Sequence, residues 1–148
     1  MIYIEGDGIT FKDEEHRTFY FEMLAKCKKN DEFHRALIYL FGITIETRWG
    51  INQLFDFEHS WINPDGLNKG WQTSGTLKIC RLAFNFWNGL ADDKGLSTPY
   101  ELFGSAFTSY FFEAIKLRFP GCMEAESYYE KASRMVAELK AEQAAPGV

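Results

Sequence analysis

Apolar side chains recur every three or four residues over most of the chain, and short polar stretches separate these segments. This spacing is typical of amphipathic helices. It predicts helices over residues 12–29, 31–41, 44–55, 74–88 and 123–143, with two shorter helices between 99 and 119. Met1–Ile4 is apolar and β-prone, and predicts a minor N-terminal strand or a tethered tail. We therefore expect an all-α fold: a compact single-domain bundle of about five to seven helices over residues 1–143, with a frayed tail at 144–148.

Capping residues mark where the first three helices begin and end. Asp13 and Asp31 stand at N-cap positions, where a carboxylate accepts a hydrogen bond from a free backbone N–H. Gly42 is placed to end the second helix, and Thr44 is placed to begin the third. Gly50 weakens that third helix by roughly 1 kcal/mol relative to alanine.

The segment 74–88 is the most apolar predicted helix, and we expect it to lie at the centre of the bundle and to end at Gly89. Further on, residues 98–101 (TPYE) have the form of a capping box with proline at the first helical position. Pro120 and Gly121 stop the helix before the C-terminal one. The packing face predicted for the C-terminal helix consists of Tyr128, Tyr129, Ala132, Met135, Val136 and Leu139.

Aromatic residues are unusually abundant: the chain has 14 Phe, 7 Tyr and 4 Trp. Each such ring buries on the order of 150–250 Å². A small helical core does not readily absorb that much aromatic surface, so we expect some rings to be exposed. Exposed aromatic side chains often mark a surface that binds another protein.

Charge and targeting signals narrow the class of protein. The formal net charge is −5, so a broad basic surface for direct nucleic-acid binding is not expected. An acidic protein can dock on a basic partner, although mild acidity is also ordinary for soluble domains. Residues 1–10 do not resemble a signal peptide, and no apolar run approaches the roughly 20 residues of a membrane span. We expect a cytoplasmic protein without membrane contact.

Neither a catalytic signature nor a cofactor motif matches the sequence, so no cofactor is expected. Cys27, Cys80 and Cys122 are an odd number at wide spacing, which disfavours a disulfide framework. Cys27 and His34 are weak candidates for zinc ligands, since zinc sites usually show closer ligand pairs. Buried ordinary cysteines are the simpler interpretation, and a zinc-stabilised helical domain is the alternative.

Polar residues on the predicted helices offer two candidate sites. Asp31 lies three residues before His34, where its carboxylate either orients the imidazole or only caps the helix. Arg81 and Asn85 share the polar stripe of the 74–88 helix, which is either exposed to solvent or the floor of a groove that binds an anion. Arg48 joins this groove if the third helix lies alongside.

The connection 56–72 is long and contains two tryptophans, Trp61 and Trp71. Its segment 63–66 (NPDG) predicts a type I turn. Aromatic side chains in such a loop either cover the core or anchor a partner, and the sequence leaves both possibilities open.

Seven stretches of the chain carry a family resemblance. They are FKDEEH (11–16), HRALIYLFG (34–42), NQLFDF (52–57), GWQT (70–73), CRLAFNFWNG (80–89), TPYELF (98–103) and FEAIKLRFP (112–120). Together they resemble an uncharacterised family of short proteins from gut Firmicutes, their prophages and mobile elements. The resemblance covers about residues 11–120 and implies no site residue.

The resemblance implies a genomic context in which small acidic proteins often bind host machinery, as anti-CRISPR proteins do. The expected function is therefore a non-enzymatic binding module for a host protein, with a defence nuclease that binds nucleic acid as the narrower expectation. Its candidate binding residues are His34, Arg48, Trp61, Trp71, Arg81 and Asn85. One alternative is a small enzyme or ligand-binding domain with a polar pocket around His34, Arg48 and Arg81; the zinc-stabilised interaction domain is the other.

Overall fold

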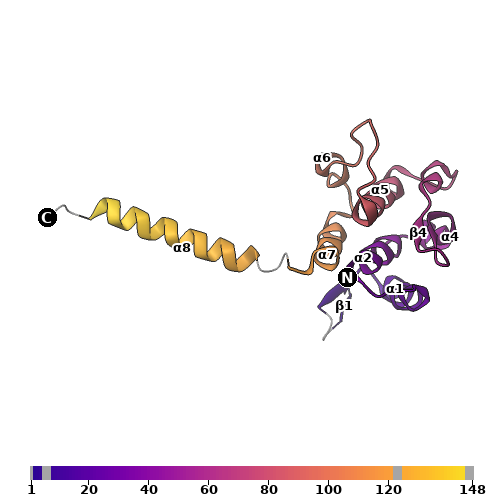
Figure 1. Ribbon diagram of the computed structural model, residues 1–148, viewed down its shortest axis with the longest axis horizontal. Coiled ribbons are helices and arrows are strands. Elements are labelled where there is room, and N and C mark those ends of the chain that lie inside the picture. Colours follow the sequence, from indigo (N-terminus) through magenta and orange to yellow (C-terminus); the bar gives the residue numbers. More distant parts are fainter. Residues whose placement is uncertain (1, 5–7, 122–124, 146–148) are drawn as a thin grey trace.

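The computed structural model describes residues 2–4, 8–121 and 125–145, and Figure 1 shows their arrangement. Its elements are β1 (Ile2–Ile4), β2 (Ile9–Phe11), α1 (Glu14–Lys26), α2 (Glu32–Phe41), α3 (Ile45–Trp49), α4 (Ile51–Leu54), β3 (Phe55–Asp56), β4 (Trp61–Ile62), the 3₁₀ helix η1 (Pro64–Asn68), α5 (Ser74–Asn88), α6 (Pro99–Leu102), α7 (Thr108–Arg118) and α8 (Ala125–Ala144). The all-α class with a minor N-terminal strand is confirmed.

Helix α2 lies at the centre of the fold and packs against α1, α5 and α7. Its residues 36–41 (ALIYLF) are fully shielded from water, because this segment is apolar on every side and must be covered all round. The expectation that the 74–88 helix is central was wrong. That helix is α5, which covers α2 on one side and leaves Phe86 and Trp87 only partly buried.

The N-terminal strand belongs to an antiparallel hairpin in which β1 pairs with β2. The backbone of Thr10 in β2 holds this hairpin on the helices. Its carbonyl oxygen accepts a hydrogen bond from the Tyr39 hydroxyl at 2.6 Å, and its N–H donates to Glu113 Oε1 at 3.0 Å. These two bonds join β2 to α2 and α7, and they place Phe11 in the core.

The predicted helix 44–55 is divided at Gly50 into α3 and α4. A Cβ atom at Gly50 would lie 2.4 Å from Trp71 Cζ2, so only glycine lets the indole approach this closely. After α4 the chain forms the small hairpin β3–β4, and the predicted turn at 63–66 becomes the start of η1. The long connection therefore has structure of its own, which periodicity did not predict.

Most of the predicted helix ends are confirmed. Asp13, Asp31 and Thr44 each accept a hydrogen bond from the backbone N–H three residues on. Gly89 ends α5 in the left-handed conformation with φ of +79°. The capping box at Thr98 was wrong, because its hydroxyl donates to the Gly95 carbonyl oxygen and caps no N–H of α6.

Helix α8 extends away from the other helices (Figure 1), and its side chains are exposed from residue 129 to 145. The face that we expected to pack in the bundle is instead open to water at Tyr129, Met135, Val136 and Leu139. The side chain of Tyr128 lies outside the described residues, as do residues 146–148 of the tail. A single domain over 1–143 stays a prediction.

None of the helices in the described part of the chain combines the length and apolar character that crossing a membrane requires.

Candidate functional site: an apolar groove between three helices

The expectation that the core cannot hide every aromatic ring is confirmed. Seven aromatic side chains among the described residues are substantially exposed: Phe21, Trp49, Trp61, Tyr100, Phe112, Phe119 and Tyr129. They are not spread evenly, since Phe112 and Phe119 border a common groove and Trp49 belongs to a separate surface.

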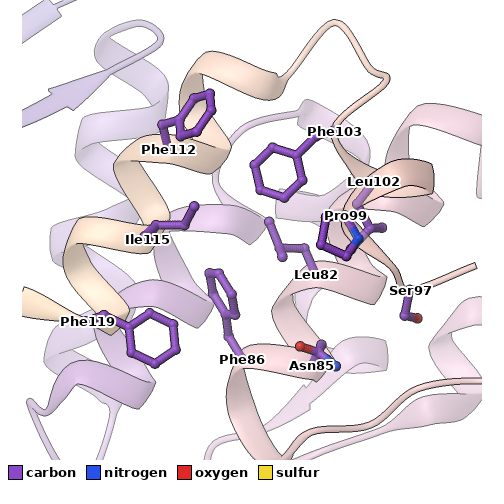
Figure 2. A pocket seen from close by; sticks show the side chains of 10 residues that line it. All are labelled: Leu82, Asn85, Phe86, Ser97, Pro99, Leu102, Phe103, Phe112, Ile115 and Phe119. Atoms are coloured by element: carbon purple, nitrogen blue, oxygen red, sulfur yellow. The ribbon is translucent and has the colours of Figure 1, made fainter. Parts of the chain in front are cut away.

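The groove lies between α5, α6 and α7 and has a volume of about 470 Å³. Figure 2 shows the ten side chains around it. They are Leu82, Asn85, Phe86, Ser97, Pro99, Leu102, Phe103, Phe112, Ile115 and Phe119. Only Asn85 and Ser97 carry polar side-chain atoms, so the groove suits an apolar occupant.

One face of α7 forms a wall of the groove, because Phe112, Ile115 and Phe119 follow one another at helical spacing. The adjacent face of α7 carries Phe111 and Ala114, which are completely buried, and α7 packs against α2. Helix α7 is therefore apolar on two sides but covered on one. Phe112 and Phe119 remain 56% and 48% exposed.

Arg118 contacts the side chain of one groove residue and the backbone of another. Its Nε donates a hydrogen bond to the Phe86 carbonyl oxygen at 2.8 Å, which links α7 to α5. Its guanidinium carbon lies 4.6 Å from the centre of the Phe119 ring and 4.0 Å from that of Phe33. Cation–π contacts of this kind hold the Phe119 ring in place at the end of the groove.

A second aromatic surface surrounds Trp49, which is 83% exposed. A shallow hollow of about 200 Å³ beside it is lined by Trp71 and Gln53, among others. The Trp71 indole N–H donates to Gln53 Oε1 at 2.7 Å, and the ring lies over Gly50. Trp71 thus partly covers the core and partly faces solvent.

Trp61 is exposed on β4 and stacks on His59, with ring centres 4.4 Å apart. The His59 ring is in turn within 3.0 Å of Asp56 Oδ2. The indole is therefore held flat against the hairpin, and it lines none of the hollows described above.

His34 is buried in the first turn of α2, where Asp31 both caps the helix and orients the imidazole. Asp31 Oδ1 lies 2.7 Å from His34 Nδ1. Burial opposes ionisation of this carboxyl, but the hydrogen bonds from His34 lower the pKa of Asp31. The ring lies edge-on to Trp87, and Nε2 has no hydrogen-bond partner among the described residues. The imidazole is therefore enclosed, whereas the Asp31 side chain is 32% exposed.

Arg48, Arg81 and Asn85 do not form one polar site. Arg48 donates to the Gly42 carbonyl oxygen at 2.9 Å, which links α3 to the end of α2. Arg81 Nε lies 3.5 Å from Asp92 Oδ2 in a different hollow, and Asn85 donates to the Leu90 carbonyl oxygen. None of the contacts described for these residues or for His34 joins two of the four, so they do not define the polar pocket of the alternative hypothesis.

The cysteines of the described region are unreactive by position. Burial raises the pKa of the Cys27 thiol to about 11 and that of Cys80 to about 12, so both stay protonated near neutral pH. Cys122 lies outside the described residues. No group of three or more His, Cys, Asp or Glu side chains in the described part of the chain is arranged to hold a metal ion.

The remaining histidine of the chain lies in the core. His16 is completely buried, and burial lowers its pKa from 6.5 to about 4. Its Nδ1 accepts a hydrogen bond from the Lys12 backbone N–H at 3.0 Å, so Nε2 carries the proton that is donated to the Tyr39 carbonyl oxygen at 2.7 Å. Asp13 and His16 have the same spacing at a helix start as Asp31 and His34. The sequence therefore contained a signal for a second buried histidine.

These features define a small helical protein with an apolar groove between α5, α6 and α7. The chain belongs to a family described as "Family of unknown function (DUF6075)", which matches residues 7–131. The match includes the groove and ends within α8. Comparisons with curated proteins and with solved structures found no match.

Proposed function

We propose that this protein is a non-enzymatic binding module, which uses the groove between α5, α6 and α7 to hold an apolar helical segment of a partner protein. The observation that carries the proposal is the open apolar wall formed by Phe112, Ile115 and Phe119. A helix that docks in a groove presents anchors at the same i, i+3, i+7 spacing. Phe112 and Phe119 are the residues expected to contribute most, because aromatic anchors dominate such interfaces.

The narrower proposal concerns the partner. A protein from a prophage or mobile element, acting in the cytoplasm, would bind a host protein, and an RNA-guided defence nuclease is the partner class that we favour. The net charge of −5 supports a partner with a basic surface around its nucleic-acid channel. In this proposal the groove supplies apolar anchoring and the acidic surface supplies electrostatic attraction.

The test uses the full chain as bait in lysate of its host. The wild type is compared with Phe112→Glu, which places a charge in the groove, and with Ser109→Glu, which places the same charge on an exposed part of α7 outside the groove lining. We expect a partner in stoichiometric amount on the wild type and on Ser109→Glu, but not on Phe112→Glu. If the captured partner is a nuclease, the wild-type protein should slow its cleavage of target DNA.

Two results would contradict the proposal. The groove is not the binding site if Phe112→Glu retains the partner as well as the wild type does. The binding-module proposal itself fails if no stoichiometric partner is captured and the protein leaves defence-nuclease cleavage unchanged.

A further inference from the structure

The hollow beside Trp49 combines two indoles with a carboxylate, and we call it the Trp49 hollow. Its lining consists of Glu46, Trp49, Gly50, Gln53 and Trp71. Its volume is about 200 Å³, below the roughly 300–1,000 Å³ of sites that enclose a drug-sized ligand, so it suits the head group of a single side chain. Trp49 is 83% exposed, and tryptophan is among the residues that contribute most to an interface once a partner covers them.

Glu46 gives the Trp49 hollow its charge. Glu46 is the charged residue among the five that line the hollow, and its exposed carboxylate has neither an ion pair nor a hydrogen bond in the described part of the chain. Two cations lie nearby in the sequence without filling the hollow. Arg48 donates to the Gly42 carbonyl oxygen at 2.9 Å, and neither Arg48 nor Lys69 is a lining residue. An unpaired carboxylate beside aromatic rings favours a cationic occupant, because the face of an indole is itself electronegative.

Trp71 offers this occupant an aromatic surface without a free polar atom. Its indole N–H is already used in the hydrogen bond to Gln53 Oε1, and the ring lies over Gly50. Trp71 is partly buried, and the part of it that lines the hollow is therefore apolar. Attraction of a cation to this ring depends on its π-electrons and not on a hydrogen bond.

Arg118 provides an example of such a contact within the same chain. Its guanidinium carbon lies 4.0 Å from the centre of the Phe33 ring and 4.6 Å from that of Phe119. Among the residues that the structure describes, no cation lies over Trp49 or Trp71 in this way. A guanidinium suits two rings and a carboxylate better than an ammonium does, because it is planar, stacks on aromatic faces and donates two parallel hydrogen bonds to a carboxylate.

We infer that the Trp49 hollow binds the guanidinium head of an arginine from a partner protein, with the Trp49 and Trp71 indoles in contact with it and the Glu46 carboxylate as its counter-ion. The choice of a protein partner rests on the proposed function, in which the chain binds a partner with a basic surface. Net charge attracts any basic surface, whereas this hollow selects one arginine by shape as well as by charge. It is a second anchor point, separate from the α5–α6–α7 groove.

The first test is an NMR titration of the full chain with a blocked tripeptide, glycine-arginine-glycine. Two further peptides replace the arginine by citrulline, which has the same shape without the charge, or by lysine. We expect the arginine peptide to shift the indole N–H resonances of Trp49 and Trp71, but not that of Trp61, whose ring already stacks on His59. The citrulline peptide should cause no shift, and the lysine peptide should bind at least about threefold more weakly. An arginine peptide without effect, or one that binds no better than the other two, would overturn the inference.

Three variants show whether the shifts arise at this hollow. Trp49→Ala removes an exposed ring, and Glu46→Gln removes the charge while keeping the shape, so circular dichroism should show that both stay folded. Each should weaken binding of the arginine peptide about tenfold. Glu142→Gln removes the same charge from an exposed position on α8 and should bind as the wild type does. Equal weakening by Glu142→Gln and Glu46→Gln would attribute binding to net charge and overturn the assignment, as would full affinity in both Trp49→Ala and Glu46→Gln.

Free L-arginine distinguishes a protein partner from a small molecule. We expect it to bind no more tightly than the arginine peptide, because the hollow accommodates only the head group. Tighter binding of the free amino acid would overturn the assignment to a partner protein.

The two proposals fail separately. A partner that is lost on Phe112→Glu, together with no response to the arginine peptide, removes the arginine site and keeps the binding module. A response to the arginine peptide without any captured partner does the reverse.

Discussion

The two sides of α2 use aromatic residues in opposite ways. Towards α1 and β2, the rings of Phe11, His16, Tyr20 and Tyr39 pack at centre distances of 4.5 to 6.3 Å and are closed to water. Beyond α5 and α7, phenylalanine rings border a groove, and two of them, Phe112 and Phe119, remain about half exposed. Abundance of aromatic residues thus has two causes in one small chain. One side needs them to fill a core, and the other displays them.

The largest expected effect tests the closed side of α2, which is the side that faces α1 and β2. Phe11→Ala should lower the free energy of unfolding by ~3–5 kcal/mol, because it leaves a cavity among Tyr20, Tyr39 and His16. Phe21→Ala is the matched control, since its ring contacts Phe11 but is 41% exposed, and its loss should be smaller. Urea denaturation measures both. Similar losses of unfolding free energy for the two variants would mean that the closed side of α2 is not the stabilising core.

The pH dependence of stability sharpens the same contrast. His16 stays neutral in the fold down to its pKa of about 4, whereas in the unfolded chain it takes a proton below about 6.5. The unfolded state is therefore favoured as the pH falls from 6.5 to 4, by about 3 kcal/mol at the end of this window. Above 6.5 the contribution of His16 is constant.

The control for this prediction is His16→Gln, which removes the titrating group. The variant should be less stable than the wild type at neutral pH, but the difference between them should narrow between pH 6.5 and 4. Parallel stability curves for the two proteins would assign the acid sensitivity to other groups.

Two glycine substitutions compare a rigid contact with a yielding one. At Gly42 an added Cβ would lie 2.6 Å from His16 Cδ2, which is fixed in the core, so Gly42→Ala should cost about 1–3 kcal/mol. At Gly50 the contact is with Trp71, a partly exposed side chain that is able to move. Gly50→Ala should therefore cost less in stability but shift the Trp71 indole N–H resonance in NMR. A larger loss of stability for Gly50→Ala than for Gly42→Ala would contradict this difference between a neighbour fixed in the core and one that is able to move.

The smallest expected change in stability lies in the groove. Phe112→Ala should alter the free energy of unfolding by no more than ~0.5 kcal/mol, because the ring is mostly open to water. Phe111→Ala, one residue earlier and completely buried, should cost ~3–5 kcal/mol. Thermal unfolding followed by circular dichroism compares them directly. A large loss at Phe112 would show that its ring stabilises the fold rather than displaying a binding surface.

Local signals in the sequence predicted the helices well where the cause was local. Asp13, Asp31 and Thr44 cap helices because their side chains reach a backbone N–H only three residues away. The division at Gly50 was not predictable in this way, because it depends on Trp71, 21 positions further along the chain. The low helix propensity of glycine indicated that the helix is weak at Gly50. It did not indicate that the Trp71 indole requires a glycine at this position.

The sequence analysis named Asn85, which lines the groove, but it missed the groove phenylalanines for a related reason. Phe111 and Phe112 are adjacent, and each belongs to an apolar face of α7, but periodicity does not show which face a neighbouring helix covers. The polar candidates His34, Arg48 and Arg81 were chosen because such residues are conspicuous in sequence. Each proved to be tied to a local partner, whereas ordinary phenylalanines line the exposed groove.

Arg118 has a consequence for the thermodynamics of any complex at the groove. Because one guanidinium already restrains Phe119 and the backbone at Phe86, the end of the groove is ordered before an occupant arrives. The rotamer entropy that flexible anchors lose on association, about 0.5–1.5 kcal/mol for each side chain, is for Phe119 lost largely during folding instead. Docking at this end should therefore resemble the fitting of rigid bodies, with slow dissociation as its kinetic signature.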